Sequence, residues 1–96
     1  MLLYLENYGE GYAGGIARTY AMPLFAVQRQ LRKFEDGGVL TSRLVGRARV
    51  YTWNARNPTT APLRRLLAES FKYVPEEEIR RYYRERRRPR RAGKPL

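Results

Sequence analysis

The segment 39–54, with the sequence Val-Leu-Thr-Ser-Arg-Leu-Val-Gly-Arg-Ala-Arg-Val-Tyr-Thr-Trp-Asn, is the most informative part of the chain for its fold. It contains two runs rich in β-branched and aromatic residues, and Gly46-Arg47 separates them. Two such runs joined by a two-residue loop that begins with glycine are typical of a β-hairpin. Tyr51 and Trp53 fall on one face of the second run, with Arg49 on the same face nearer the tip. We therefore expect the two aromatic side chains in the core and the tip arginines in solvent.

The residues before the hairpin predict three helices. The first ends near Tyr8, where Gly9 is available as a left-handed cap. The second covers about 12–20, and we expect its apolar stripe to consist of Ala13, Ile16, Ala17 and Tyr20. The third covers about 24–36, with a buried stripe made of Leu24, Val27, Leu31 and Phe34.

The residues after the hairpin predict a helical extension and a basic tail. Residues 57–60 form a linker, and a helix follows from about Pro62 to Tyr73. Pro75 and three glutamates open another helix, with the acids at its positive end. Residues 86–96 are rich in arginine and are expected to be disordered. The apolar face of the 62–73 helix consists of Leu63, Leu66, Leu67, Ser70 and Phe71.

The charge of the chain points to a polyanionic partner. Twenty Lys and Arg residues against nine Asp and Glu give a formal net charge of +11. Residues 1–23 hold one basic and two acidic side chains, residues 24–54 six and two, and residues 55–96 thirteen and five. This balance favours nucleic acid first and an acidic membrane surface second. We expect the first segment to be structural and the rest to meet the partner.

The residue types that are absent exclude several functions. Without cysteine or histidine the chain cannot form disulfides or thiolate and imidazole metal sites, and it lacks the commonest general base. No apolar run approaches the ~20 residues of a membrane span, and Met1–Leu5 is too short for a signal peptide. We therefore expect a cytoplasmic protein that is not an enzyme, needs no cofactor or metal and does not enter a membrane.

The predicted order of elements is that of a winged helix-turn-helix domain, because two helices joined by the turn 21–23 precede a hairpin. Three segments resemble the ArsR- and MarR-like winged-helix regulators. Residues 11–19 are similar to their positioning helix, residues 27–40 to their recognition helix and its exit, and residues 46–51 to their Gly-Arg-x-Arg-x-Tyr wing. The resemblance covers about residues 1–54, and Gly14-Gly15 departs from the usual helix formers.

The resemblance implies an α+β fold with a three-helix core, a two-stranded wing and a C-terminal helical extension. It also implies a transcriptional regulator that binds duplex DNA, here without a recognisable sensor site. We assign residues 1–56 to the winged helix-turn-helix domain, residues 57–85 to the extension and residues 86–96 to the basic tail.

The candidate DNA contacts lie on the third helix and on the hairpin. Gln28 and Arg29 lie off the buried stripe, and these side-chain types pair with adenine and guanine respectively. Arg32 and Lys33 are expected to hold phosphates rather than to read bases. The complete candidate set is Phe25, Gln28, Arg29, Arg32, Lys33, Arg43, Arg47 and Arg49.

Several of these features have a structural explanation as well. Phe25 is as consistent with core packing as with contact to a thymine methyl group. For Gln28 and Arg29, the alternative to base contact is an ordinary polar helix face that is exposed to solvent. Tyr51 and Trp53 could stack on bases, but core packing is favoured. The glutamates 76–78 are better explained by compensation of a helix end than by a metal or catalytic cluster. Gly14-Gly15 leaves room for another backbone or for a phosphate.

Two other functions stay open, a basic RNA- or ribosome-associated protein that binds through its arginine tail, and a winged-helix protein–protein adaptor. The apolar 62–73 helix is expected to pack on the first helix. In the family that the chain resembles, such helices often build the dimer interface, so we expect a homodimer. Its recognition helices would lie one duplex turn apart, roughly 34–36 Å.

Overall fold

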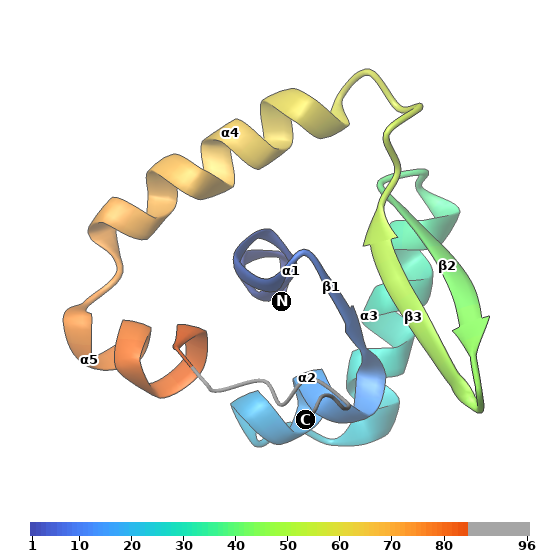
Figure 1. Ribbon diagram of the computed structural model, residues 1–96, viewed down its shortest axis with the longest axis horizontal. Helices are drawn as coiled ribbons and strands as arrows, with labels where there is room; N and C mark the ends of the chain where they lie inside the picture. The colour runs from blue at the N-terminus through green and yellow to red at the C-terminus, as the bar shows by residue number, and fades with distance from the viewer. Residues whose placement is uncertain (85–96) are drawn as a thin grey trace, which may run out of the picture.

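The computed structural model describes residues 1–84 as an α+β fold, in which helices and an antiparallel three-stranded sheet surround helix α1 (Figure 1). The predicted α+β class is confirmed. The predicted tail 86–96 and the last residue of the predicted extension lie outside the described residues. The elements are α1 (Leu2–Tyr8), β1 (Glu10–Tyr12), α2 (Ala13–Tyr20), α3 (Leu24–Asp36), β2 (Leu40–Val45), β3 (Ala48–Trp53), α4 (Thr60–Ser70), a 3-10 turn η1 (Phe71–Tyr73), α5 (Glu76–Glu78) and a π-helical turn η2 (Ile79–Tyr83).

The predicted hairpin is confirmed, and its tip is the pair Gly46-Arg47. Gly46 has φ +63°, a left-handed conformation that glycine adopts without steric cost. The expectation of a sheet with only two strands was wrong, because β1 pairs with β3 on the side away from β2. A three-residue strand carries no periodicity from which it could be predicted. Gly11 lets β1 lie close to α1, since a Cβ at this position would stand 2.9 Å from Cε1 of Tyr4.

Helices α2 and α3 form as predicted, and a tight turn joins them. Ala21 adopts the left-handed conformation at the end of α2, with φ 56°. The backbone N–H of Met22 donates to the carbonyl of Ala17 at 2.9 Å and closes the turn. Pro23 precedes the first residue of α3 and has an extended conformation. This turn sets the direction in which α3 leaves α2.

The core lies where α1, α2, α3 and β2 meet. Its fully buried side chains are Leu5, Ile16, Val27, Leu31 and Leu40. Tyr51 is buried as expected. Trp53 is half-buried at the edge of the core, where its indole Nε1 donates to the carbonyl of Leu5 at 3.4 Å. The prediction that Leu24 is buried was wrong, because this first residue of α3 is not packed against the core cluster and is 49 % exposed.

The C-terminal elements pass around α1 on the side away from the β2–β3 hairpin (Figure 1). Helix α4 packs on α1 as predicted, and Arg64 Nε pairs with Glu6 Oε1 at 2.8 Å. Leu63 and Leu67 are half-buried, but Leu66 is 63 % exposed, so the apolar face of α4 is covered only in part. Within residues 1–84, no helix combines the length and the apolar character that crossing a bilayer requires.

Candidate nucleic-acid interface

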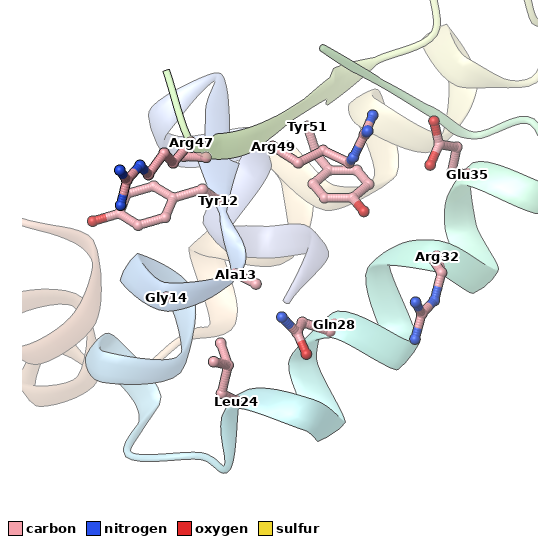
Figure 2. A pocket seen from close by; sticks show the side chains of 11 residues that line it. Tyr12, Ala13, Gly14, Leu24, Gln28, Arg32, Glu35, Arg47, Arg49 and Tyr51 are labelled. Carbon is pink, nitrogen blue, oxygen red and sulfur yellow. The ribbon is translucent and has the colours of Figure 1, made fainter. Parts of the chain in front are cut away.

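A concave groove of about 480 Å³ lies between α3 and the β2–β3 hairpin (Figure 2). We call it the helix–hairpin groove. Helix α3 forms one wall, the hairpin forms the other, and the junction of β1 with α2 closes the end between them. Its lining residues are Tyr12, Ala13, Gly14, Leu24, Gln28, Arg32, Glu35, Arg47, Ala48, Arg49 and Tyr51.

The wall that α3 contributes is polar because of the helical repeat. Gln28, Arg32 and Glu35 follow one another at intervals of about one turn, so they lie on the same side of the helix. Val27 and Leu31 are completely buried, and their packing fixes the rotation of α3 about its axis. The apolar stripe therefore determines which polar residues face the hairpin.

The wall that the hairpin contributes carries two arginines. Arg47 lies in the turn. Arg49 lies on the same face of β3 as the buried Tyr51, closer to the turn. Both arginine side chains are exposed to solvent, as predicted. With Arg32 of α3 across the groove, three arginines line one concave surface. The planar guanidinium fork suits phosphate oxygens, which accept two parallel hydrogen bonds from it.

A polar chain ties the two walls together. Arg49 Nη1 donates to Ser42 Oγ at 3.0 Å, and Ser42 Oγ donates to Glu35 Oε2 at 2.7 Å. Burial raises the pKa of the Tyr51 hydroxyl, and the carboxylate of Glu35 raises it further. The groove thus has a cationic rim and one carboxylate, which is held in place by the hairpin.

Tyr12 is a groove residue that the sequence analysis missed. Its ring lies over the first turn of α2, so that a Cβ at Gly14 or Gly15 would stand 3.2 Å or 3.0 Å from ring carbons. Arg18 Nη2 donates to the Tyr12 hydroxyl at 3.0 Å and holds the ring. The room left by the double glycine is thus filled by a side chain of the same chain. An aromatic residue two positions before two adjacent glycines was the signal in the sequence.

The structure brings four of the eight candidate residues into the groove and places the other four elsewhere. Gln28, Arg32, Arg47 and Arg49 line it. Phe25, Arg29 and Lys33 are exposed on α3 outside the groove, and Phe25 is 65 % exposed rather than packed in the core.

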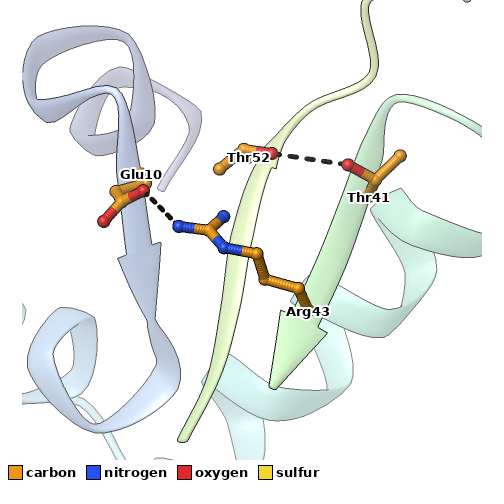
Figure 3. Close-up of polar contacts among 4 residues, drawn as sticks. All are labelled: Glu10, Thr41, Arg43 and Thr52. Atoms are coloured by element: carbon orange, nitrogen blue, oxygen red, sulfur yellow. Dashed lines mark hydrogen bonds and ion pairs between the residues drawn. The ribbon is translucent and has the colours of Figure 1, made fainter. Parts of the chain in front are cut away.

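Arg43 belongs to a different surface. It alternates with Ser42 and Leu44 along β2, so it projects from the face of the sheet opposite the groove. There Arg43 Nη2 pairs with Glu10 Oε1 at 3.0 Å across β3, and the hydroxyls of Thr41 and Thr52 lie 3.4 Å apart (Figure 3). Arg43 is therefore not among the residues that line the groove.

Comparisons with protein-family models, with curated proteins and with solved structures gave no match. Among residues 1–84, no group of three or more acidic, cysteine or histidine residues is placed to hold a metal ion. One of the glutamates at the start of α5, Glu76, pairs with Arg84 Nη1 at 3.1 Å. The assignment of function therefore depends on the geometry and charge of the groove.

Proposed function

We propose that this protein is a winged helix-turn-helix protein that binds duplex DNA and regulates transcription. The observation that carries the proposal is the placement of Arg32 of α3 opposite Arg47 and Arg49 of the hairpin, on the two walls of one groove. A phosphate backbone passing between a helix in the major groove and a wing beside it would meet cations on both sides. Phosphate contacts of this kind supply most of the affinity of DNA-binding proteins.

The exposed side of α3 supports its role as the recognition helix. The major groove of B-DNA is wide enough to admit an α-helix, and its base pairs present distinct patterns of donors and acceptors. Arg29 lies on the exposed side of α3, and Gln28 lies where that side turns into the groove. In this proposal Arg29 and Gln28 read base edges, Phe25 contacts a thymine methyl group, and Lys33 and Arg32 hold phosphates.

The class that we propose is that of the ArsR- and MarR-like regulators, in a form without a sensor site. Its support is the order of α2, a tight turn, α3 and a hairpin, together with the three segments that resemble this family. The third strand, β1, pairs only with residues 50–52 of β3, so the hairpin tip at Gly46-Arg47 extends beyond it, and in this proposal the tip meets DNA. We also propose that the protein acts by binding, without catalysis. We propose the cytoplasm as its location.

A homodimer completes the proposal. Helix α4 leaves Leu66 exposed, and an apolar hollow of about 600 Å³ is lined by residues of α1, α3 and α4, including Leu3, Phe34 and Leu67. A second copy of the chain packed on this surface would bury these side chains. It would also present two recognition helices to a roughly palindromic site.

The experiment that tests duplex binding is a salt titration. We expect the affinity for a 30-base-pair duplex to fall by ~10³–10⁵ between 50 and 200 mM salt if several phosphates are held. The double variant Arg32→Gln with Arg49→Gln should bind more weakly and with a shallower salt slope. Arg65→Gln, an exposed position on α4 outside the groove, is the matched control. Undetectable binding at low salt, or preference for structured RNA over duplex DNA, would overturn the proposal.

A further inference from the structure

A single hydroxyl group lies between a cation and an anion on opposite walls of the helix–hairpin groove. Arg49 Nη1 donates to Ser42 Oγ at 3.0 Å, and Ser42 Oγ donates to Glu35 Oε2 at 2.7 Å. Figure 2 shows the Arg49 side chain extending from the hairpin toward Glu35 of α3. A hydroxyl accepts one hydrogen bond while it donates another, so Ser42 serves both charged groups at once. The two charges are thus linked through a neutral group.

The register of the hairpin places this hydroxyl. Ser42 pairs directly with Tyr51 across β2 and β3, and Leu44 pairs with Arg49. Ser42 and Arg49 are therefore diagonal neighbours on one face of the sheet, a separation that a long side chain can span. Glu35 reaches the same point from the last turn of α3. The contact among the three side chains thus depends on the hairpin and on α3 together.

This arrangement leaves one edge of the Arg49 guanidinium unused. Among residues 1–84, the structure gives Arg49 one hydrogen bond, through Nη1. The Nε and Nη2 groups carry the parallel N–H bonds that recognise a phosphate or a carboxylate side-on, and the Arg49 side chain is exposed. No ion pair of the described residues includes Glu35. A carboxylate therefore lies close to this arginine without occupying its free edge.

We propose that Ser42 is a positioning residue, which keeps Arg49 apart from Glu35 and thereby presents the free edge of the guanidinium to a phosphate of the duplex. The inference rests on the proposed function and deepens it, because it names the residue that keeps one cation of the groove available. Carboxylate and phosphate compete for the same guanidinium fork, since both accept two parallel hydrogen bonds from it. Glu35 orients the Ser42 hydroxyl, because it accepts the hydrogen bond from it.

The first test removes the hydroxyl. In Ser42→Ala we expect Arg49 to pair directly with Glu35, so that one phosphate contact is lost. Duplex affinity should fall about eightfold at 0.1 M salt, and the slope of log affinity against log salt should become shallower by about 0.9. Ser42→Thr keeps a hydroxyl at this position and should retain the wild-type slope. An unchanged slope in Ser42→Ala would overturn the inference.

The matched control removes the neighbouring hydroxyl on the opposite face of β2. Thr41 lies next to Ser42, but its hydroxyl faces that of Thr52 at 3.4 Å, away from the groove. Thr41→Val should therefore leave both the affinity and the salt slope unchanged. An equal loss in Thr41→Val and Ser42→Ala would show a general effect on β2 and would overturn the inference.

The second test separates positioning from support of the fold. Ser42→Ala is combined with Glu35→Gln, which removes the charge that would capture Arg49. In this background Ser42→Ala should change duplex affinity by less than about twofold, because the two substitutions act on one contact. A loss as large as that in the wild-type background would show that Ser42 only supports the hairpin, and it would overturn the inference.

The structure of Ser42→Ala without DNA provides a readout that is independent of binding. An ion pair between Arg49 and Glu35 is expected in its crystal structure, and side chains that stay apart would overturn the inference. A wild-type protein that binds no duplex would overturn the proposed function, and the inference with it. Duplex binding with an unchanged slope in Ser42→Ala would overturn the inference alone.

Discussion

The ring of Tyr12 occupies the space in which a side chain at Gly15 would stand, since a Cβ at Gly15 would lie 3.0 Å from Tyr12 Cε1. This contact explains why α2 carries two adjacent glycines, although glycine is a poor helix former. The ring closes one end of the helix–hairpin groove, and Arg18 holds it there. Glycine thus allows an aromatic side chain to become part of the candidate interface.

This contact predicts the effect of Gly15→Ala. In a Tyr12→Ala background, Gly15→Ala should stabilise the protein by up to about 1 kcal/mol, the usual gain in helix propensity. In the wild-type background the gain should be smaller or reversed, because the Tyr12 ring must move. Urea unfolding of the four proteins gives the coupling free energy. Equal effects in both backgrounds would contradict the packing described here.

Glu35 is predicted to weaken duplex binding, because its carboxylate shares the groove with the arginines. Glu35→Gln keeps an acceptor for the Ser42 hydroxyl and removes the charge. We expect roughly fivefold tighter binding, the effect of removing one nearby repulsion at an intermediate dielectric constant. Glu69→Gln on α4, where the carboxylate pairs with Lys72, is the control and should change affinity little. Weaker binding by Glu35→Gln would show that phosphates do not enter the groove.

Arg29 and Arg47 are predicted to differ in what they recognise. Arg29→Ala should cost roughly 1–3 kcal/mol on the preferred site and relax its sequence preference, because arginine reads guanine through two hydrogen bonds. Arg47→Ala should weaken all duplexes more evenly. Arg43→Ala should have the smallest effect, since Arg43 pairs with Glu10 on the far face of the sheet. Measuring the affinity for a library of duplex sequences separates these outcomes. If Arg29→Ala and Arg47→Ala lower the affinity equally for all sequences, α3 is not the recognition helix.

Stability is predicted to fall at high pH because of Tyr20. Burial raises the pKa of Tyr20 far above its ordinary value of 10.0, and the hydrogen bond with Tyr83 raises it further. Below about pH 10 the phenol is protonated in both the folded and the unfolded state, so its ionisation does not make the free energy of unfolding depend on pH. Above that pH only the unfolded state ionises, and the free energy of unfolding decreases. Tyr20→Phe should flatten this decrease in urea titrations, whereas Tyr73→Phe, at a residue that is 85 % exposed, should retain it.

The proposed homodimer predicts different effects at two neighbouring leucines. Leu66 is exposed on α4, so Leu66→Glu should yield a folded monomer with weaker DNA binding, because an unpaired charge would be buried in the interface. Leu67 is half-buried against the same chain, so Leu67→Glu should lower monomer stability as well. Light scattering of the wild type at high micromolar concentration measures whether the protein is a monomer or a dimer. A monomer at that concentration would contradict the proposed dimer, and the proposal of duplex binding would still stand.

Local patterns of residues were sufficient to predict several elements of the fold. The helical repeat of Val27 and Leu31 predicts α3, and the strand runs around Gly46 predict the hairpin, because these patterns depend only on neighbouring residues. The net charge of the chain likewise needs no structure. These features were enough to place Gln28, Arg32 and the tip arginines on the elements that form the groove.

Which of these residues come into contact depends on how the elements pack in three dimensions. Strand β1 forms because it pairs with β3, and a strand of three residues is too short to show a periodic sequence pattern. Arg43 and Arg49 are alike in sequence, but the sheet register directs them to opposite faces. The side chains of Asn7 and Tyr8 hold the carbonyls of η2 across more than 70 residues of chain. Such contacts depend on how distant elements pack, and no local pattern of residues encodes that packing.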